Sequence, residues 1–164
     1  MKVIRNINNN VALCIDSKGK EVIVFGKGIG FSKVPCEIPL NKIERTFYDL
    51  DNQYISLLND LSSESLKIAD IVVNYAIEKL NCELNSNLIF NIADHIDFAI
   101  ERYRKNIKMS LSIFNDIEHL YDAEMEVGKY ALDVIYNVAR VRLPEEEAAC
   151  IALNIINSEY NLHK

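Results

Sequence analysis

The chain has 164 residues, 49% hydrophobic and 26% charged, a globular balance that fits one ordinary domain or two small ones. No apolar run approaches the roughly 20 residues that cross a bilayer, so no membrane insertion is expected. The charged stretch Met1–Asn6 does not resemble an export signal. Residues 1–48 hold eight Lys and Arg against four Asp and Glu, whereas residues 49–164 hold ten against twenty. A basic part joined to an acidic part predicts two domains with different partners, of which only the first suits phosphates.

The four cysteines are Cys14, Cys36, Cys82 and Cys150. They are widely spaced, with no CxxC pair and no nearby histidine cluster. We therefore expect neither a disulfide framework nor a metal site, and interpret them as reduced thiols of a cytoplasmic protein.

The first third of the chain has the short period of β-structure. Four strands are predicted, over residues 2–7, 11–15, 21–25 and about 43–48. The segment Asp16–Lys20 has turn chemistry and predicts a hairpin, and glycines and prolines fill the stretch before the last strand. A sheet of about 50 residues buries too little apolar surface to be stable as a monomer, so we expect a homodimer.

From about Asp60 the apolar period becomes helical. Apolar stripes at helical spacing predict five helices, over residues 69–80, 89–103, 111–120, 123–138 and 143–155. Ser62 or Ser63 is the expected N-cap of the first helix, and Pro144 followed by three glutamates is typical of the first turn of the last. The predicted fold is a multi-domain α and β protein. A small antiparallel four-stranded β-sheet domain (residues 1–56) and a linker (57–63) precede an all-α five-helix bundle (64–164).

Two N-terminal segments carry the chemistry of nucleic-acid contact, Arg5–Asn10 and Gly26–Phe31. Asparagines can read base edges and 2′-hydroxyls, glycines let a ligand approach the backbone, and Phe31 can stack on a base. Arg5, Lys27 and Lys33 can hold phosphates.

The same segments have plainer interpretations. An asparagine run is commonly a turn, spaced glycines are commonly a flexible loop, and Phe31 could belong to the core. The glycines do not open a helix with a dinucleotide fingerprint and no Walker lysine follows them, so no nucleotide cofactor is expected.

In order and spacing from Met1, the string Ile7–Val11, the hairpin after it and Gly26–Phe31 resemble the co-antiterminator domain of the BglG/SacY/LicT family of transcriptional antiterminators. The resemblance implies a four-stranded sheet that dimerises and binds an imperfect hairpin in nascent mRNA. The RNA contacts that it implies are Arg5, Asn8, Asn10, Gly26, Lys27 and Phe31. Two positions depart from the family, which usually has Arg at Lys27 and Gln at Ser32. Lysine keeps the positive charge of arginine but cannot form the two parallel hydrogen bonds of a planar guanidinium group.

The helical part resembles a phosphotransferase regulation domain (PRD). The segment Ala93–Arg102 is similar to its first phosphoacceptor segment, residues 120–132 to its middle and residues 143–157 to its closing helix. The resemblance implies that His95 accepts phosphate from the sugar phosphotransferase system, with the HPr phosphocarrier and a sugar-specific enzyme II subunit as partners.

On the residues alone, His95 lies at the edge of an apolar stripe between Asp94 and Asp97. A neighbouring carboxylate can fix the imidazole tautomer and leave the other nitrogen as a nucleophile. The alternative is a partly buried structural histidine.

The regulation domain shows two further departures. The family usually has a second histidine where this chain has Asn154, which cannot carry a phosphoryl group, so we expect one phosphorylation site. His119 and His163 match no phosphoacceptor motif and are expected at the surface. Family members also normally carry a second regulation domain.

The predicted function is transcriptional antitermination. A homodimer would bind a leader-mRNA hairpin, exclude the overlapping terminator, and lose its active form when His95 is phosphorylated. Two alternatives stay open: a phosphorylated signalling protein with weak or no RNA binding, and a constitutive RNA binder whose helical domain only dimerises. No catalytic constellation is present in the sequence, so the protein would be the substrate of an enzyme rather than an enzyme.

Overall fold

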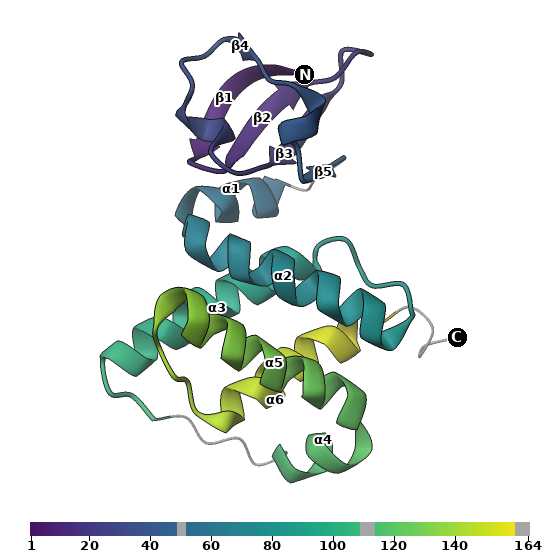
Figure 1. The fold of residues 1–164 in the computed structure, drawn as a ribbon, viewed down its shortest axis with the longest axis vertical. Helices are drawn as coiled ribbons and strands as arrows, with labels where there is room; N and C mark the ends of the chain where they lie inside the picture. Colours follow the sequence, from purple (N-terminus) through teal and green to yellow (C-terminus); the bar gives the residue numbers. More distant parts are fainter. Residues whose placement is uncertain (49–51, 109–113, 160–164) are drawn as a thin grey trace. The chain divides into compact units, whose positions relative to one another are not determined.

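The computed structural model describes residues 1–48, 52–108 and 114–159. These residues belong to two compact units, residues 1–63 and residues 64–164 (Figure 1). The first unit holds all the named strands and the second holds a helical bundle, in agreement with the predicted class.

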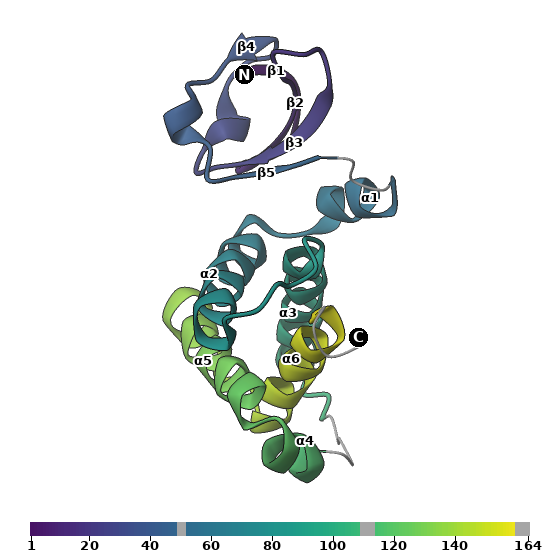
Figure 2. The ribbon, with the colours of Figure 1, turned by 90° about the vertical axis from the view of Figure 1, so that its right-hand side faces the viewer.

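The first unit is an antiparallel sheet in the strand order β4-β1-β2-β3-β5. The strands are β1 (Lys2–Asn8), β2 (Val11–Ile15), β3 (Glu21–Phe25), β4 (Cys36–Glu37) and β5 (Arg45–Phe47). The 3-10 turns η1 (Ile29–Phe31) and η2 (Leu40–Lys42) lie between β3 and β5. Figure 2 shows the strands and these turns curling around an interior.

The predicted hairpin is confirmed, because β2 and β3 pair along their full lengths. The turn of this hairpin depends on Asp16 and Gly19, two residue types that favour turns. The Asp16 carboxylate accepts hydrogen bonds from the backbone N–H groups of Lys18 and Lys20, and Gly19 has a φ of 80°. Only glycine adopts that left-handed conformation at little cost.

The described part of the sheet has five strands, not the predicted four. The additional strand is β4, which pairs with β1 where Val3 lies opposite Cys36. It has two residues and lies between Pro35 and Pro39. Proline removes a ladder donor and breaks the alternating pattern, so the sequence indicated a loop there.

The core of the sheet unit follows the period of two. Alternate residues of the strands point inward with Ile29 of η1. The buried cluster consists of Val3, Ala12, Cys14, Val22, Val24, Ile29 and Ile38. Burial raises the pKa of the Cys14 thiol to about 11, so this thiol is an apolar core group rather than a reactive one.

A helix that the sequence analysis did not predict follows the sheet. It is α1 (Asn52–Asp60), which contacts β1. Leu58 and Leu61 are buried, and Tyr54 and Leu57 are half-buried. This is a helical spacing, but a nine-residue helix is marginal in water without tertiary contacts. The segment 57–63, expected as a linker, therefore contains the end of α1 and the start of the next helix.

The described residues of the second unit form five helices, the predicted number. These are α2 (Ser63–Leu80), α3 (Leu88–Arg104), α4 (Phe114–Leu120), α5 (Asp122–Ala139) and α6 (Glu145–Ser158). Residues 111–113 of the predicted third stripe lie outside the described residues. The helix α6 begins after Pro144, as predicted from its first turn.

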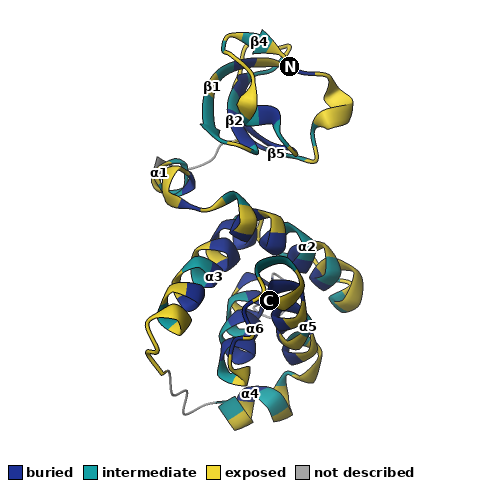
Figure 3. Ribbon diagram, turned by 60° about the vertical axis from the view of Figure 1, so that its left-hand side comes forward, coloured by how far each residue is buried: buried dark blue, intermediate teal, exposed yellow. Residues whose placement is uncertain are grey.

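The bundle is built around α6, which contacts α3, α4 and α5. Gly128 of α5 permits one of these contacts, since a Cβ atom there would lie 2.2 Å from the backbone oxygen of Ala148. Buried residues lie on the inner sides of the helices, coloured dark blue in Figure 3. The largest include Phe90, Ile92, Ile96, Met125, Ile135, Ile151 and Ile155. Each contributes about 1.5–3 kcal/mol through burial. Among the described helices, none combines the length and the apolarity of a membrane span.

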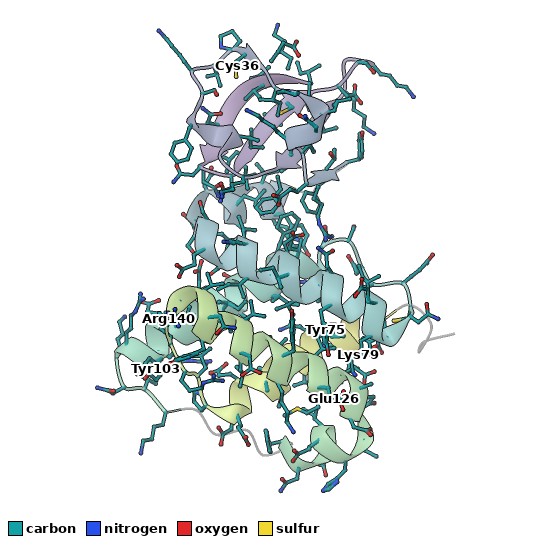
Figure 4. All side chains as sticks on the ribbon, in the orientation of Figure 1. Cys36, Tyr75, Lys79, Tyr103, Glu126 and Arg140 are labelled. Carbon is teal, nitrogen blue, oxygen red and sulfur yellow. The ribbon has the colours of Figure 1, made fainter. Side chains whose placement is uncertain are left out.

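Two side-chain contacts connect α2 to α5. The rings of Tyr75 and Tyr130 stack with their centroids 3.9 Å apart. One turn further, the Lys79 ammonium lies 2.5 Å from the Glu126 carboxylate. Figure 4 labels Tyr75, Lys79 and Glu126 on these helices. Exposed ion pairs stabilise little, so the ring stack is the stronger contact.

Candidate functional site

In the sheet unit, the predicted RNA-binding segments are hydrogen-bonded to each other. The Asn10 side-chain oxygen accepts the N–H of Gly28 at 2.8 Å, and the Asn8 side-chain oxygen accepts the N–H of Asn10 at 2.9 Å. The Gly30 N–H donates to the backbone oxygen of Asn9 at 3.0 Å. The turn between β1 and β2 therefore holds the loop after β3 in one conformation.

The glycines of this loop are needed by the fold itself. A Cβ atom on Gly30 would lie 1.7 Å from the Asn8 backbone oxygen, and one on Gly26 would lie 2.2 Å from that of Lys42. Gly28 has a φ of 73°. Gly26 and Gly30 thus allow close approach of the chain to itself, whereas the sequence interpretation assigned that approach to a ligand, and Gly28 supplies a left-handed turn.

Three of the predicted contact residues remain available to a partner. Arg5 and Lys27 are exposed, and the Phe31 side chain is 73% exposed, so the interpretation of Phe31 as a core residue is wrong. Sequence reasoning missed Asn6, whose amide nitrogen donates to the Ser32 backbone oxygen at 2.7 Å and connects β1 to the loop. The side-chain oxygen of Asn6 and the amide nitrogen of Asn8 are buried without a hydrogen-bond partner among the described residues.

In the helical unit, His95 forms a charged cluster with two residues distant in sequence. The His95 Nε2 lies 2.7 Å from Oε2 of Glu147, and an Arg102 guanidinium nitrogen lies 2.5 Å from Oε1 of the same carboxylate. The Glu147 side chain is 3% exposed, against 18% for His95 and 19% for Arg102. A carboxylate so deeply buried requires such partners, and each of its oxygens has one.

The carboxylate that holds His95 is therefore not a sequence neighbour. Asp97 accepts a hydrogen bond from the Ser65 hydroxyl at 2.5 Å, and Asp94 is exposed. The carboxylate hydrogen-bonded to Nε2 of His95 is that of Glu147, where the sequence had suggested Asp94 or Asp97. Both lie next to His95 in sequence, but on a helix residues one or two apart face different directions. Packing of α3 on α6 supplies Glu147 instead.

Cys150 and Asn154 follow Glu147 on α6 at helical spacing. The ligand atoms of His95, Glu147 and Cys150 all lie within 4.8 Å of one another. Burial, and then the nearby Glu147 carboxylate, raise the pKa of the Cys150 thiol. The Asn154 amide donates to the backbone oxygen of Cys150 at 3.2 Å. His119 is exposed on α4, as predicted, and His163 lies outside the described residues.

A cavity of about 610 Å³ lies beside this cluster. Arg102 and Glu147 form part of its wall, together with the basic residues Arg104 and Lys108 and the exposed side chain of Tyr103 (labelled in Figure 4). The Arg102 guanidinium also lies over the Phe98 ring, 4.8 Å from its centroid. The cavity wall thus holds three basic residues, Arg102, Arg104 and Lys108, and two acidic ones, Glu146 and Glu147.

The two units correspond to two known families. The family model of the CAT RNA binding domain matches residues 1–55, and that of the PRD domain matches residues 70–158. The chain belongs to the PRD domain family. The resemblance inferred from the motifs is confirmed.

Relatives and a solved structure agree with this assignment. The chain is 36% identical to the transcription antiterminator LicT of Bacillus subtilis (strain 168), over 98% of this chain and 60% of LicT. It is 34% identical to the beta-glucoside operon antiterminator of Dickeya chrysanthemi, over 99% of this chain and 59% of that protein. The chain thus spans about three-fifths of these relatives. The crystal structure of GlcT CAT-PRDI matches with a TM-score of 0.85 and 29% identity, over 98% of each chain.

Proposed function

We propose that this chain acts as a transcriptional antiterminator, with the sheet unit as the RNA-binding part and the helical unit as its phosphate-controlled switch. The observation that carries the proposal is the presence in one chain of a CAT RNA binding domain and a PRD domain. A homodimer binds a hairpin in leader mRNA and excludes the overlapping terminator. The proposed protein is a regulator and not an enzyme, like the antiterminators that it is similar to.

The proposed RNA contacts are Arg5, Asn8, Asn10, Gly26, Lys27 and Phe31. Arg5 and Lys27 supply exposed positive charge, and Phe31 supplies an exposed ring on which a base can stack. The loop that carries Lys27 is held by the Asn10 side chain, and Asn10 is itself held by the Asn8 side chain, so little conformational entropy is lost when RNA binds. These two asparagines therefore order the loop before RNA binds, in addition to their proposed contacts with the RNA.

In the helical unit, His95 is the proposed phosphoacceptor. With Nε2–H donated to Glu147, the Nδ1 atom carries the lone pair that a phosphoryl donor needs. The HPr phosphocarrier or an enzyme II subunit is the proposed donor. Asn154 stands where the family has a second histidine, so a single phosphoryl group is expected.

The phosphoryl group would change the pairing of charges in the cluster. It adds roughly −1.5 to −2 charge near the buried Glu147 carboxylate, by analogy with other phosphorylated side chains. Repulsion from Glu147 and attraction to Arg102 both favour transfer of the guanidinium from the carboxylate to the phosphate. Because Glu147 belongs to α6 and Arg102 to α3, this exchange would loosen the contact between these helices.

A mobility-shift titration with a family-type antiterminator hairpin tests the RNA-binding half of the proposal. We expect salt-dependent binding that Phe31→Ala weakens about 5- to 150-fold, since stacking on one base contributes roughly 1–3 kcal/mol. Leu40→Ala is the matched control, because Leu40 is 70% exposed against 73% for Phe31 and lies outside the glycine loop. Equal binding of a scrambled hairpin would exclude antitermination by this chain and favour the signalling alternative.

A further inference from the structure

We propose that His95, Glu147 and Cys150 form a binding site for a divalent transition-metal ion of the zinc class. One ligand atom from each residue lies within 4.8 Å of the other two. His95 comes from α3, and the other two come from adjacent turns of α6. This cluster was not predictable from the sequence, because Cys150 belongs to no CxxC pair and His95 lies far from it along the chain.

The three donors are a set that zinc accepts. Imidazole nitrogen, carboxylate oxygen and thiolate sulfur bind Zn²⁺ at about 2.0–2.3 Å, and three protein ligands leave a fourth position for water. In such a tetrahedron the donor atoms lie about 3.3–3.6 Å apart. The His95 and Glu147 atoms, now 2.7 Å apart, would move slightly apart, and the Cys150 sulfur would move inward. The ion would take the place of the proton between Nε2 and Oε2, and the ring would carry its proton on Nδ1, so that a neutral imidazole binds through Nε2.

The surroundings suit a bound carboxylate. Arg102 occupies Oε1 of Glu147 and leaves Oε2 directed toward His95. Hydrogen bonding of the second oxygen is typical of metal-bound carboxylates, because it fixes their orientation. The guanidinium charge also repels a cation, so we expect weaker binding than at a structural zinc site with several thiolates.

Binding must displace the Cys150 proton. Burial raises the pKa of this thiol, with a further increase from the Glu147 carboxylate and an opposing decrease from Arg102. A consequence, which rests on the proposed function, is that a metal ion on His95 would compete with phosphoryl transfer to it.

The test is a titration of the metal-free 164-residue chain with Zn²⁺ in competition with a chromophoric chelator. We expect one equivalent of Zn²⁺ per chain. Cys150→Ser and His95→Gln should each weaken binding at least about tenfold, since even the loss of an outer-shell partner costs 10–100-fold. The matched controls are Cys36→Ser, also half-buried, and His119→Gln, both of which should bind Zn²⁺ like the unmodified chain.

Substitution with Co²⁺ supplies a second measurement on the unmodified chain. A thiolate-to-cobalt charge-transfer band that disappears in Cys150→Ser supports the site, with far-ultraviolet circular dichroism to confirm that the variant is folded. Absence of that band, or Zn²⁺ binding that Cys150→Ser leaves unchanged, would overturn the proposal. RNA binding and phosphorylation are measured separately with chelator present, so failure of the metal site is distinguishable from failure of the antiterminator function.

Discussion

The Glu147 carboxylate lies 2.7 Å from Nε2 of His95, although 52 residues separate them in the chain. The contact connects α3 to α6 and places a buried carboxylate at the bundle's proposed phosphoacceptor. Arg102 shares the same carboxylate, so one buried group determines the orientation of the imidazole and the pairing of the guanidinium.

Replacement of this carboxylate should destabilise the bundle. Glu147→Gln keeps the shape but leaves Arg102 without its opposite charge. We expect a loss of about 2 kcal/mol, below the roughly 3–5 kcal/mol of fully buried pairs because His95 and Arg102 are partly exposed. Urea unfolding followed by circular dichroism measures the change. The control is Glu145→Gln, an exposed residue in the same first turn. If both variants unfold at the same urea concentration, the Glu147 cluster does not stabilise the bundle.

The sequence singles out His95 as the candidate phosphoacceptor but not the partner of its side chain, for a physical reason. The apolar stripe of α3 and the family motif both single out His95. Glu147 stands third in a run of three glutamates, and nothing local distinguishes it from Glu145 or Glu146. Only the packing of α6 on α3 buries one of the three. Cys150 was not predictable for the same reason, because only the packing of the bundle brings it close to His95.

In the sheet unit, alternating apolar residues and the turn Asp16–Lys20 were sufficient to predict the β2–β3 hairpin. The two-residue strand β4 was not predictable, because its pairing with β1 is determined by tertiary contacts rather than by its own composition. The role of Gly30 was also missed, since the oxygen that excludes a side chain there belongs to Asn8, on another segment.

Gly30 should therefore tolerate no side chain. Gly30→Ala places a Cβ atom 1.7 Å from a backbone oxygen, so the β1–β2 turn or the loop must move. Gly19→Ala is the comparison, because that site is open and its cost is only the backbone strain of φ 80°, roughly 1–2 kcal/mol. We expect Gly30→Ala to lower the free energy of unfolding of the sheet unit more than Gly19→Ala does. Amide NMR spectra and urea titrations measure both. The reverse order would show that the loop is more adaptable than its hydrogen bonds indicate.

Lys27 should contribute charge to RNA binding without bidentate contact. Lys27→Ala is expected to weaken hairpin binding and to reduce the slope of log affinity against log salt by about 1, as for the loss of one phosphate contact. Lys27→Arg should strengthen binding, because the guanidinium adds a planar fork at the same charge. Lys18→Ala, an exposed lysine in the hairpin turn, is the control. Identical salt slopes for the unmodified chain and Lys27→Ala would place Lys27 outside the RNA contact.

The C-terminal end of α6 should make stability dependent on pH. Burial, the hydrogen bond that protonated Glu159 donates to the Glu124 carboxylate, and the negative charge of Glu124 together raise the pKa of Glu159 to about 7 from a usual value of 4.5. The folded state therefore holds this proton more tightly than the unfolded state. The resulting stabilisation is complete below about pH 4.5 and is lost as the pH rises through 7.

Glu159→Gln removes this titration. The variant should be more stable than the unmodified chain at pH 8, and the difference should shrink toward pH 5. Thermal unfolding across that range measures it, with Glu64→Gln on the exposed first turn of α2 as control. A stability difference independent of pH would contradict the assignment of the titration to Glu159.

Transfer of phosphate to His95 tests the central claim most directly. The purified chain is incubated with phosphoenolpyruvate, enzyme I and the HPr phosphocarrier, and then with a sugar-specific enzyme II subunit, and acid-labile phosphate is located by mass spectrometry. The account predicts one phosphoryl group, on His95, that is absent in His95→Ala and retained in His119→Ala. Phosphate on another residue, or none from either donor, would contradict the assignment of the helical unit as a phosphate-controlled switch.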